Sequence, residues 1–366
     1  MEYNTKVAAR VLALGIITPK NRHVDQTEYF EEFLNLLKSN NITPTHKHFI
    51  TLRTIDSGLF LTKGKLEELH ALCKEHEIEE VIFSEALTPH QESELEHYLD
   101  ITVFDKTHLI LEIFENRARS AEAKLQTKIA FLEFRKTRVA GKGKHFSQQG
   151  AGIGTRGPGQ TQKEIDLEHI AHLLIKLTKD LKQLKKVRDN QRKNRIRTKQ
   201  YIISLVGYTN AGKTTLFNTM TKSENYVEDL LFATLDTTTR EMMLEGEKLL
   251  VSDTVGFIQN LPHDLIEAFQ STLEEILYAN LILHVIDMSN TNWKKQIQTV
   301  NQVLEDMNVD FKKVVCVFNK MDKITPEKLK ELEWQLPEGP RVFITAQTKE
   351  GIKPLLEFIV NHLVGA

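Results

Sequence analysis

A phosphate-binding loop is predicted at residues 207–214, which read G-Y-T-N-A-G-K-T and match the pattern G-x-x-x-x-G-K-[ST]. The apolar run 201–206 before it is typical of a buried strand, and Leu216 lies in a helical pattern after it. In such a loop, consecutive backbone N–H groups point at phosphate oxygens. Lys213 can reach the β- and γ-phosphates, and the Thr214 hydroxyl can hold Mg²⁺. The loop therefore predicts a nucleoside triphosphate site with Mg²⁺ as cofactor.

Three further motifs follow in order, each at the end of a predicted strand. They are Asp253-Thr-Val-Gly256, Asn319-Lys-Met-Asp322 and Thr345-Ala-Gln347. Asp253 is suited to hold Mg²⁺ through water, and the Gly256 N–H to sense the γ-phosphate. The Asp322 carboxylate can accept two hydrogen bonds from guanine that adenine does not offer. In this order the motifs resemble a translation-factor-class GTPase domain over residues 201–366, which implies GTP and GDP as ligands and a doubly wound, mostly parallel α/β sheet.

The Mg²⁺ shell of the GTP-bound state needs one more hydroxyl, and a Thr-rich stretch before Asp253 supplies candidates. Its F-A-T-L-D segment resembles the switch I motif of one bacterial GTPase group, which would make Thr234 the ligand. Spacing alone leaves Thr237, Thr238 and Thr239 as alternatives, and an ordinary polar loop also favours Thr.

Two positions bear on how hydrolysis is driven. Many GTPases place a Gln directly after the D-x-x-G glycine to orient the attacking water, whereas this chain has Phe257. We therefore expect slow hydrolysis without a partner, whether Phe257 only packs in a hydrophobic switch or has a positive role. Asn210 occupies a loop position at which monovalent-cation-stimulated GTPases often carry Asn, so K⁺ is a second expected cofactor. A solvent-facing Asn with a turn preference is the alternative.

The composition is that of an ordinary soluble globular chain. It has 366 residues, 40% of them hydrophobic and 27% charged, with a net charge of −2, and this length predicts two or three domains. Cys73 and Cys316 are far apart in sequence and predict neither a disulfide framework nor a zinc site. No apolar run approaches the ~18 residues that a membrane helix needs, so no membrane span is expected. We expect a cytoplasmic monomer, with partial membrane association left open.

The first hundred residues alternate strand and helix patterns. Strands are predicted at 7–14, 48–52 and 81–84, and helices at 28–37, 63–73 and 89–99. This alternation predicts a small parallel sheet.

The middle of the chain predicts a basic helical hairpin. Helical periodicity runs over 107–134 and again over 165–184, which predicts two long antiparallel helices. Residues 176–199 carry eleven Lys and Arg against two Asp, and this local net charge of +9 suits a phosphate backbone, although a solvated helix face is the alternative. The Gly-rich loop between the helices matches G-x-G-x-x-G at 152–157, but no strand precedes it, so a dinucleotide site is rejected. Contact of this basic loop with folded RNA is the favoured interpretation.

The loop also carries a family resemblance. Residues 152–164, G-I-G-T-R-G-P-G-Q-T-Q-K-E, closely resemble the signature of the HflX family of ribosome-associated GTPases, and F-E-N-R-A-R-S-A-E-A-K-L-Q at 114–126 is similar to a second run of that family. The resemblance implies binding to the large (50S) ribosomal subunit and its rRNA, with the hairpin tip reaching toward the peptidyl-transferase region, and splitting of stalled 70S ribosomes. This chain departs from the family at Gln160, where Glu is usual, and at 141–144, where a Trp-containing stretch is usual.

The resemblance further implies three segments: an N-terminal α/β subdomain at 1–105, a helical hairpin at 106–200 and a GTPase domain at 201–366. Two other functions stay open, a ribosome-assembly GTPase acting on large-subunit precursors and a signalling GTPase with protein partners.

The expected site residues fall into four groups. Catalysis is assigned to Lys213, Thr234 and Gly256. Nucleotide binding is assigned to Gly207, Tyr208, Thr209, Asn210, Ala211, Gly212, Lys213, Thr214, Thr215, Phe232, Ala233, Thr234, Leu235, Asp236, Asp253, Thr254, Val255, Gly256, Asn319, Lys320, Met321, Asp322, Thr345, Ala346 and Gln347. Mg²⁺ binding is assigned to Thr214, Thr234 and, through water, Asp253. RNA binding is assigned to Lys142, Lys144, His145, Arg156, Lys185, Lys186, Arg192 and Lys193.

Overall fold

The computed structural model describes residues 9–22, 25–141, 162–197, 200–223, 230–232, 234–235, 238–258 and 275–363, with side chains given only for 163–188 of the 162–197 helix. The chain divides into two compact units. One comprises Met1–Asn116 with Thr127–Asp180, and the other comprises Arg117–Gln126 with Leu181–Ala366. Both helices of the predicted hairpin thus pass from one unit into the other. The division into three segments at 105 and 200 stays a prediction.

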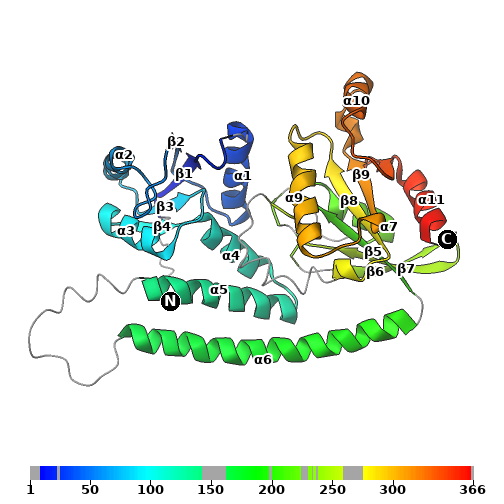
Figure 1. The fold of residues 1–366 in the computed structure, drawn as a ribbon, viewed down its shortest axis with the longest axis horizontal. Helices are drawn as coiled ribbons and strands as arrows, with labels where there is room; N and C mark the ends of the chain where they lie inside the picture. The colour runs from blue at the N-terminus through cyan, green and yellow to red at the C-terminus, as the bar shows by residue number, and fades with distance from the viewer. Residues whose placement is uncertain are drawn as a thin grey trace, which may run out of the picture. The chain divides into compact units, whose positions relative to one another are not determined.

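The first unit is built on a four-stranded parallel sheet with the order β2-β1-β3-β4 (Figure 1). Its strands are β1 (Val11–Ile17), β2 (His46–Thr51), β3 (Glu80–Phe83) and β4 (Thr102–Phe104), connected by α1 (Gln26–Ser39), α2 (Lys63–Glu75) and α3 (Pro89–Leu99). All seven residues of β1 are buried, as expected of a central parallel strand that is covered on both faces. The predicted alternation and parallel sheet are confirmed, with β1 ending later than predicted and the short β4 added.

The hairpin helices differ from the prediction at one point. The expected helix over 107–134 is two helices, α4 (Lys106–Arg117) and α5 (Ala121–Gly141). Ser120 starts the second one, because its Oγ accepts a hydrogen bond of 3.1 Å from the N–H of Ala123, as an N-cap residue does.

The partner of α5 in the hairpin is α6 (Gln162–Arg197). The two helices are antiparallel, since contacts join the end of α5 to the start of α6 and the start of α5 to the later part of α6. Lys163 Nζ donates to the Ala140 carbonyl at 2.8 Å, and Arg188 Nη1 donates to Glu122 Oε1 at 2.9 Å. The predicted antiparallel hairpin is therefore confirmed.

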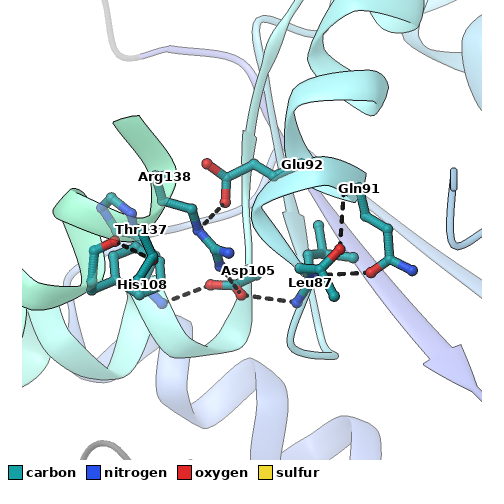
Figure 2. A network of polar contacts seen from close by, with 9 residues as sticks. Leu87, Gln91, Glu92, Asp105, His108, Thr137 and Arg138 are labelled. Carbon is teal, nitrogen blue, oxygen red and sulfur yellow. Dashed lines mark hydrogen bonds and ion pairs between the residues drawn. The ribbon is translucent and has the colours of Figure 1, made fainter. Parts of the chain in front are cut away.

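A buried ionic network holds the last turn of α5 within the first unit (Figure 2). Arg138 places Nη2 2.9 Å from Asp105 Oδ2 and Nε 2.9 Å from Glu92 Oε2. Asp105 also accepts backbone hydrogen bonds from Leu87 and His108, at 2.9 and 2.8 Å. Burial raises the pKa of the Asp105 carboxyl, and the positive charge of Arg138 acts against that rise. Since a buried charge without its partner is strongly destabilising, the network ties this helix to α3 and to the start of α4.

The second unit contains a six-stranded sheet with the order β10-β9-β8-β5-β7-β6, in which only β6 runs antiparallel to its neighbour (Figure 1). Its strands are β5 (Tyr201–Gly207), β6 (Thr238–Leu244), β7 (Glu247–Asp253), β8 (Leu281–Asp287), β9 (Val314–Asn319) and β10 (Arg341–Phe343). The described helices that connect or follow these strands include α7 (Lys213–Thr221), α9 (Trp293–Asp306), α10 (Pro326–Glu333) and α11 (Ile352–Leu363).

The predicted fold class is confirmed, and the sheet explains why the motifs meet. The four motif loops follow the carboxyl ends of β5, β7, β9 and β10. In a doubly wound sheet these ends lie along one edge, where ligands bind. Within the described part of the chain, no helix combines the length and the apolar character needed to cross a membrane.

Candidate nucleotide-binding site

The phosphate-binding loop joins β5 to α7, and both of its glycines have a positive φ. Gly212 has a φ of +93°, and a Cβ there would lie 2.2 Å from Asn319 Nδ2. The side chain of Asn319 is 3% exposed, and it connects two loops. Its Nδ2 donates to the Ala211 carbonyl at 2.9 Å, and its Oδ1 accepts from the Ala346 N–H at 3.0 Å. Asn319 thus links the phosphate-binding loop to the T-A-Q loop.

Lys213 lies at the start of α7 with only 6% of its surface exposed. Its Nζ donates to the carbonyl oxygens of Gly207 and Tyr208, at 3.1 and 2.9 Å. Burial lowers the pKa of Lys213 to about 8, and the charge of Asp253 acts against that shift. A phosphate group beside this ammonium would supply negative charge where the protein supplies mainly carbonyl dipoles.

Three oxygen-bearing side chains meet beside the loop. Thr214 Oγ1 lies 2.8 Å from Thr234 Oγ1 and donates to Asp253 Oδ2 at 2.8 Å, while Thr234 Oγ1 donates to the same oxygen at 3.3 Å. The second Asp253 oxygen, Oδ1, is buried and has no hydrogen-bond partner among the described residues. Hydroxyl and carboxylate oxygens are the donors that Mg²⁺ prefers, so this set fits the expected ion.

The other Thr candidates for the Mg²⁺ shell are placed differently from Thr234. Thr238 and Thr239 belong to β6, and the hydroxyl of Thr239 lies 3.0 Å from that of Ser252. Thr237 lies outside the described residues, as do Ala233 and Asp236. Of the described candidates, only Thr234 reaches Asp253 through its side chain.

The D-T-V-G segment is paired to the phosphate-binding loop through its backbone. The N–H of Phe257 donates to the Gly207 carbonyl at 3.2 Å, and the N–H of Thr209 donates to the Phe257 carbonyl at 2.7 Å. This pairing brings Gly256 so close to the loop that a Cβ there would lie 2.8 Å from Thr209 Cγ2 and 3.0 Å from Lys213 Nζ.

The Phe257 side chain points into the protein core. It is 4% exposed and belongs to a buried apolar cluster with Val206, Ile276 and Ile282. Of the two interpretations of Phe257, this placement supports packing in a hydrophobic switch. Phe257 therefore contributes no polar atom that could orient a water molecule.

The two motifs predicted to contact the base follow β9 and β10. Lys320 has a φ of +62°, and its Nζ lies 2.7 Å from Asp287 Oδ2. Asp322 is exposed after β9, so its carboxylate is accessible to a base.

The remaining predicted contacts lie on the same edge of the sheet, with Tyr208, Thr209, Ala211, Phe232, Leu235, Thr254, Val255, Thr345 and Ala346 buried, Thr215 and Met321 half-buried, and Asn210 and Gln347 exposed. Lys213, Thr214, Phe232, Thr234 and Gly256 line one pocket.

The predicted RNA-binding residues are only partly described. Lys185 is half-buried and Lys186 is exposed on α6. Arg192 and Lys193 lie in the same helix, but their side chains are outside the described set. Lys142, Lys144, His145 and Arg156 lie outside the described residues altogether, as does Gln160.

One buried residue near the site carries no sequence signal beyond a histidine in an apolar run. His284 lies on β8 opposite Val206 of β5 and is 2% exposed. Burial and, to a smaller extent, the positive charge of Lys213 lower the pKa of His284 to about 3. The imidazole is therefore neutral at neutral pH and adds no positive charge beside Lys213.

Comparisons with known proteins agree with this geometry. Family models match residues 202–320 (50S ribosome-binding GTPase), 27–115 (GTP-binding GTPase N-terminal) and 117–195 (GTP-binding GTPase Middle Region). The chain is 42% identical to GTPase HflX of Caldanaerobacter subterraneus over 91% of this chain and 77% of the relative. It is 38% identical to GTPase HflX of Escherichia coli over 92% of this chain and 80% of the relative. The structure of SsGBP in complex with GDP shares the fold, with a TM-score of 0.52 and 23% identity, over 97% of this chain and 99% of that chain.

The close approach at Gly256 gives a direct test of the site. We expect Gly256→Ala to weaken binding of a non-hydrolysable GTP analogue and to lower GTP turnover, each by about tenfold, because an added methyl group at such contacts typically costs about 1–3 kcal/mol. Equilibrium binding and steady-state phosphate release measure both effects. Gly64→Ala is the matched control, since nothing lies within 4 Å of a Cβ there. Wild-type affinity and turnover in Gly256→Ala would contradict the close approach.

Proposed function

The chain belongs to the HflX family of GTPases and hydrolyses GTP, and we propose that it docks on the large ribosomal subunit and promotes dissociation of stalled 70S ribosomes. The observation that carries this proposal is the match of residues 202–320 to the 50S ribosome-binding GTPase family. Relatives named GTPase HflX also align with most of this chain. The basic hairpin supports rRNA as the ligand, because clustered Lys and Arg favour phosphate backbones. A monomer in the cytoplasm is part of this proposal.

The proposed nucleotide chemistry assigns each residue one role. Lys213 would bind the β- and γ-phosphates, and Thr214 and Thr234 would hold Mg²⁺ with their hydroxyl oxygens; the ion would neutralise charge on the phosphates. Asp253 would help to hold the ion through water, and the backbone N–H of Gly256 would contact the γ-phosphate. Since Phe257 orients no water, the proposal requires help from outside this set of residues, and docking on the ribosome would supply it.

Two alternatives remain distinct from this function. A ribosome-assembly GTPase would bind large-subunit precursors and split nothing. A signalling GTPase would bind a protein partner, and its binding would not depend on the charges of Lys185, Lys186, Arg192 and Lys193.

Sucrose-gradient analysis separates the first alternative from the proposal. We expect purified 70S ribosomes, the protein and a non-hydrolysable GTP analogue to give a rise in free subunits, because the GTP-bound state favours binding to the large subunit. Lys213→Ala is the control and should give no rise. No rise with the wild-type protein would favour the assembly function. Co-sedimentation with large subunits at increasing salt tests the signalling alternative, since phosphate contacts weaken steeply with salt.

Guanine recognition by Asp322 is tested by substitution. Asp322→Asn replaces an acceptor with an amide, so we expect the preference for GTP over XTP to fall by at least about tenfold. Competition binding measures the preference, with the exposed Glu331→Gln on α10 as the control. An unchanged preference would contradict the proposed role.

Potassium stimulation is the proposed role of Asn210. We expect higher turnover in K⁺ than in Na⁺ buffer, and we expect Asn210→Gly to remove the difference. Gly is chosen because Asn210 has a φ of +60°, which Gly adopts without strain. Equal turnover of the wild-type protein in the two buffers would contradict the proposal.

A further inference from the structure

Arg188 of α6 connects the hairpin to the strands that carry the Mg²⁺ site. Its Nη1 donates to Glu122 Oε1 of α5 at 2.9 Å, and its Nη2 lies 3.2 Å from Glu275 Oε1. The three side chains are only 14 to 18% exposed. A guanidinium is a rigid fork that can hold two carboxylates at once, and such a shielded arrangement is more specific than a surface ion pair.

Glu275 continues the connection with its other carboxylate oxygen. Its Oε2 accepts hydrogen bonds from Thr239 Oγ1 at 3.4 Å and from Ser252 Oγ at 3.3 Å. These two hydroxyls lie 3.0 Å apart, and the residues are register partners on the antiparallel strands β6 and β7. Glu275 therefore holds both strands at one point.

This point adjoins the nucleotide site on both strands. Asp253 follows Ser252 directly, and its register partner is Thr238, the first residue of β6. Thr234, which donates to Asp253, lies four residues before Thr238. A shift of the Glu275 carboxylate would thus move the strand ends that place both groups.

Ile276, the residue after Glu275, adds an apolar contact between this segment and the nucleotide site. Ile276 is 1% exposed and belongs to the buried cluster that contains Phe257. The backbone of Phe257 pairs with Gly207 and Thr209 of the phosphate-binding loop. Glu275 and Ile276 therefore contact the proposed Mg²⁺ side of the site through hydroxyls and the phosphate side through packing.

We propose that Arg188 is a positioning residue for GTP binding and hydrolysis, acting through Glu275 to transmit the position of the hairpin to the arrangement of Thr234 and Asp253. Its guanidinium is engaged with Glu122 and Glu275 inside the protein, so its function differs from that of the basic residues expected to meet phosphate. The link from ribosome docking to hydrolysis rests on the proposed function. The link from Arg188 to nucleotide selection does not.

The first test uses the free, full-length protein. Arg188→Gln, Glu275→Gln and the double variant are compared with wild type for affinity to GDP and to a non-hydrolysable GTP analogue, both with Mg²⁺. We expect each single change to weaken analogue binding relative to GDP by about fivefold, the low end of typical coupling between sites, because only the GTP-bound state needs Thr234 in the Mg²⁺ shell. The double variant should show no further loss, since both changes break one pathway.

The control breaks an ion pair that joins strands β6 and β7 directly. Lys248 Nζ lies 2.7 Å from Glu241 Oε1, and both side chains are about half exposed. Glu241→Gln should leave the analogue-to-GDP ratio unchanged. A purely structural role for Arg188 would lower the thermal midpoint and weaken both nucleotides equally. Equal weakening of both nucleotides would overturn the proposal, as would an unchanged analogue-to-GDP affinity ratio in the single variants. A loss of analogue affinity in the double variant equal to the product of the two single losses would also overturn it.

The second test adds large ribosomal subunits. Arg188→Gln should co-sediment with subunits in the presence of the analogue, while stimulation of its GTP turnover by subunits falls by about fivefold relative to wild type. Full stimulation of Arg188→Gln would overturn the transmission step. If large subunits do not stimulate GTP turnover of the wild-type protein, the proposed function fails. The analogue-to-GDP affinity ratios of the first test then decide the role of Arg188.

Discussion

The backbone pairing of Phe257 with the phosphate-binding loop is the constraint on which the nucleotide site depends. Two hydrogen bonds join Phe257 to Gly207 and Thr209, and the side chain of the same residue is buried in the core. The segment cannot rotate about its own axis without losing both kinds of contact. As a result Gly256 stays against Lys213, and Asp253 stays at the end of β7 beside Thr214. The N–H proposed to sense phosphate and the carboxylate proposed to bind Mg²⁺ are thus fixed by one short stretch of chain.

The buried charges of the site explain why nucleotide and ion would bind together. Burial lowers the pKa of Lys213 and raises that of Asp253, and each group partly compensates the other. Lys213 Nζ donates hydrogen bonds to two carbonyl oxygens, while Oδ1 of Asp253 has no hydrogen-bond partner among the described residues. Phosphate oxygens would stabilise the ammonium, and Mg²⁺ would stabilise the carboxylate. The neutral His284 beneath the loop avoids adding a second positive charge that would lower the pKa of Lys213 further.

Much of this site could be predicted from sequence because each motif is a short continuous stretch of residues that directly follows a strand. A glycine-rich or Asp-bearing loop that follows an apolar strand has a conformation set by its own residues. Its position after the strand also places it at the carboxyl edge of the sheet. Features that depend on distant partners were not predictable. The break between α4 and α5 depends on the capping hydrogen bond of Ser120, which helical periodicity does not detect. The three-residue β4 is too short to show a pattern.

Long-range pairs were equally hidden in the sequence. Glu275 lies in no motif, and its partner Arg188 lies in a run of basic residues whose members look alike. The role of Phe257 was also undetermined, because a Phe after the D-x-x-G glycine is compatible with simple packing in a hydrophobic switch and with a positive role. Only the tertiary structure distinguishes these residues from their neighbours.

The pairing of Arg188 changes how the charge of α6 should be interpreted. A count of Lys and Arg treats every member of the run as available to phosphate, but the charge of Arg188 is opposed by Glu122 and Glu275. Lys186, two residues earlier, is exposed and its ammonium can meet an external polyanion. Neighbouring basic residues of one helix therefore face different partners. A polyanion that bound the exposed residues would contact the same helix that carries Arg188, so the proposed transmission to Glu275 needs no change in local secondary structure.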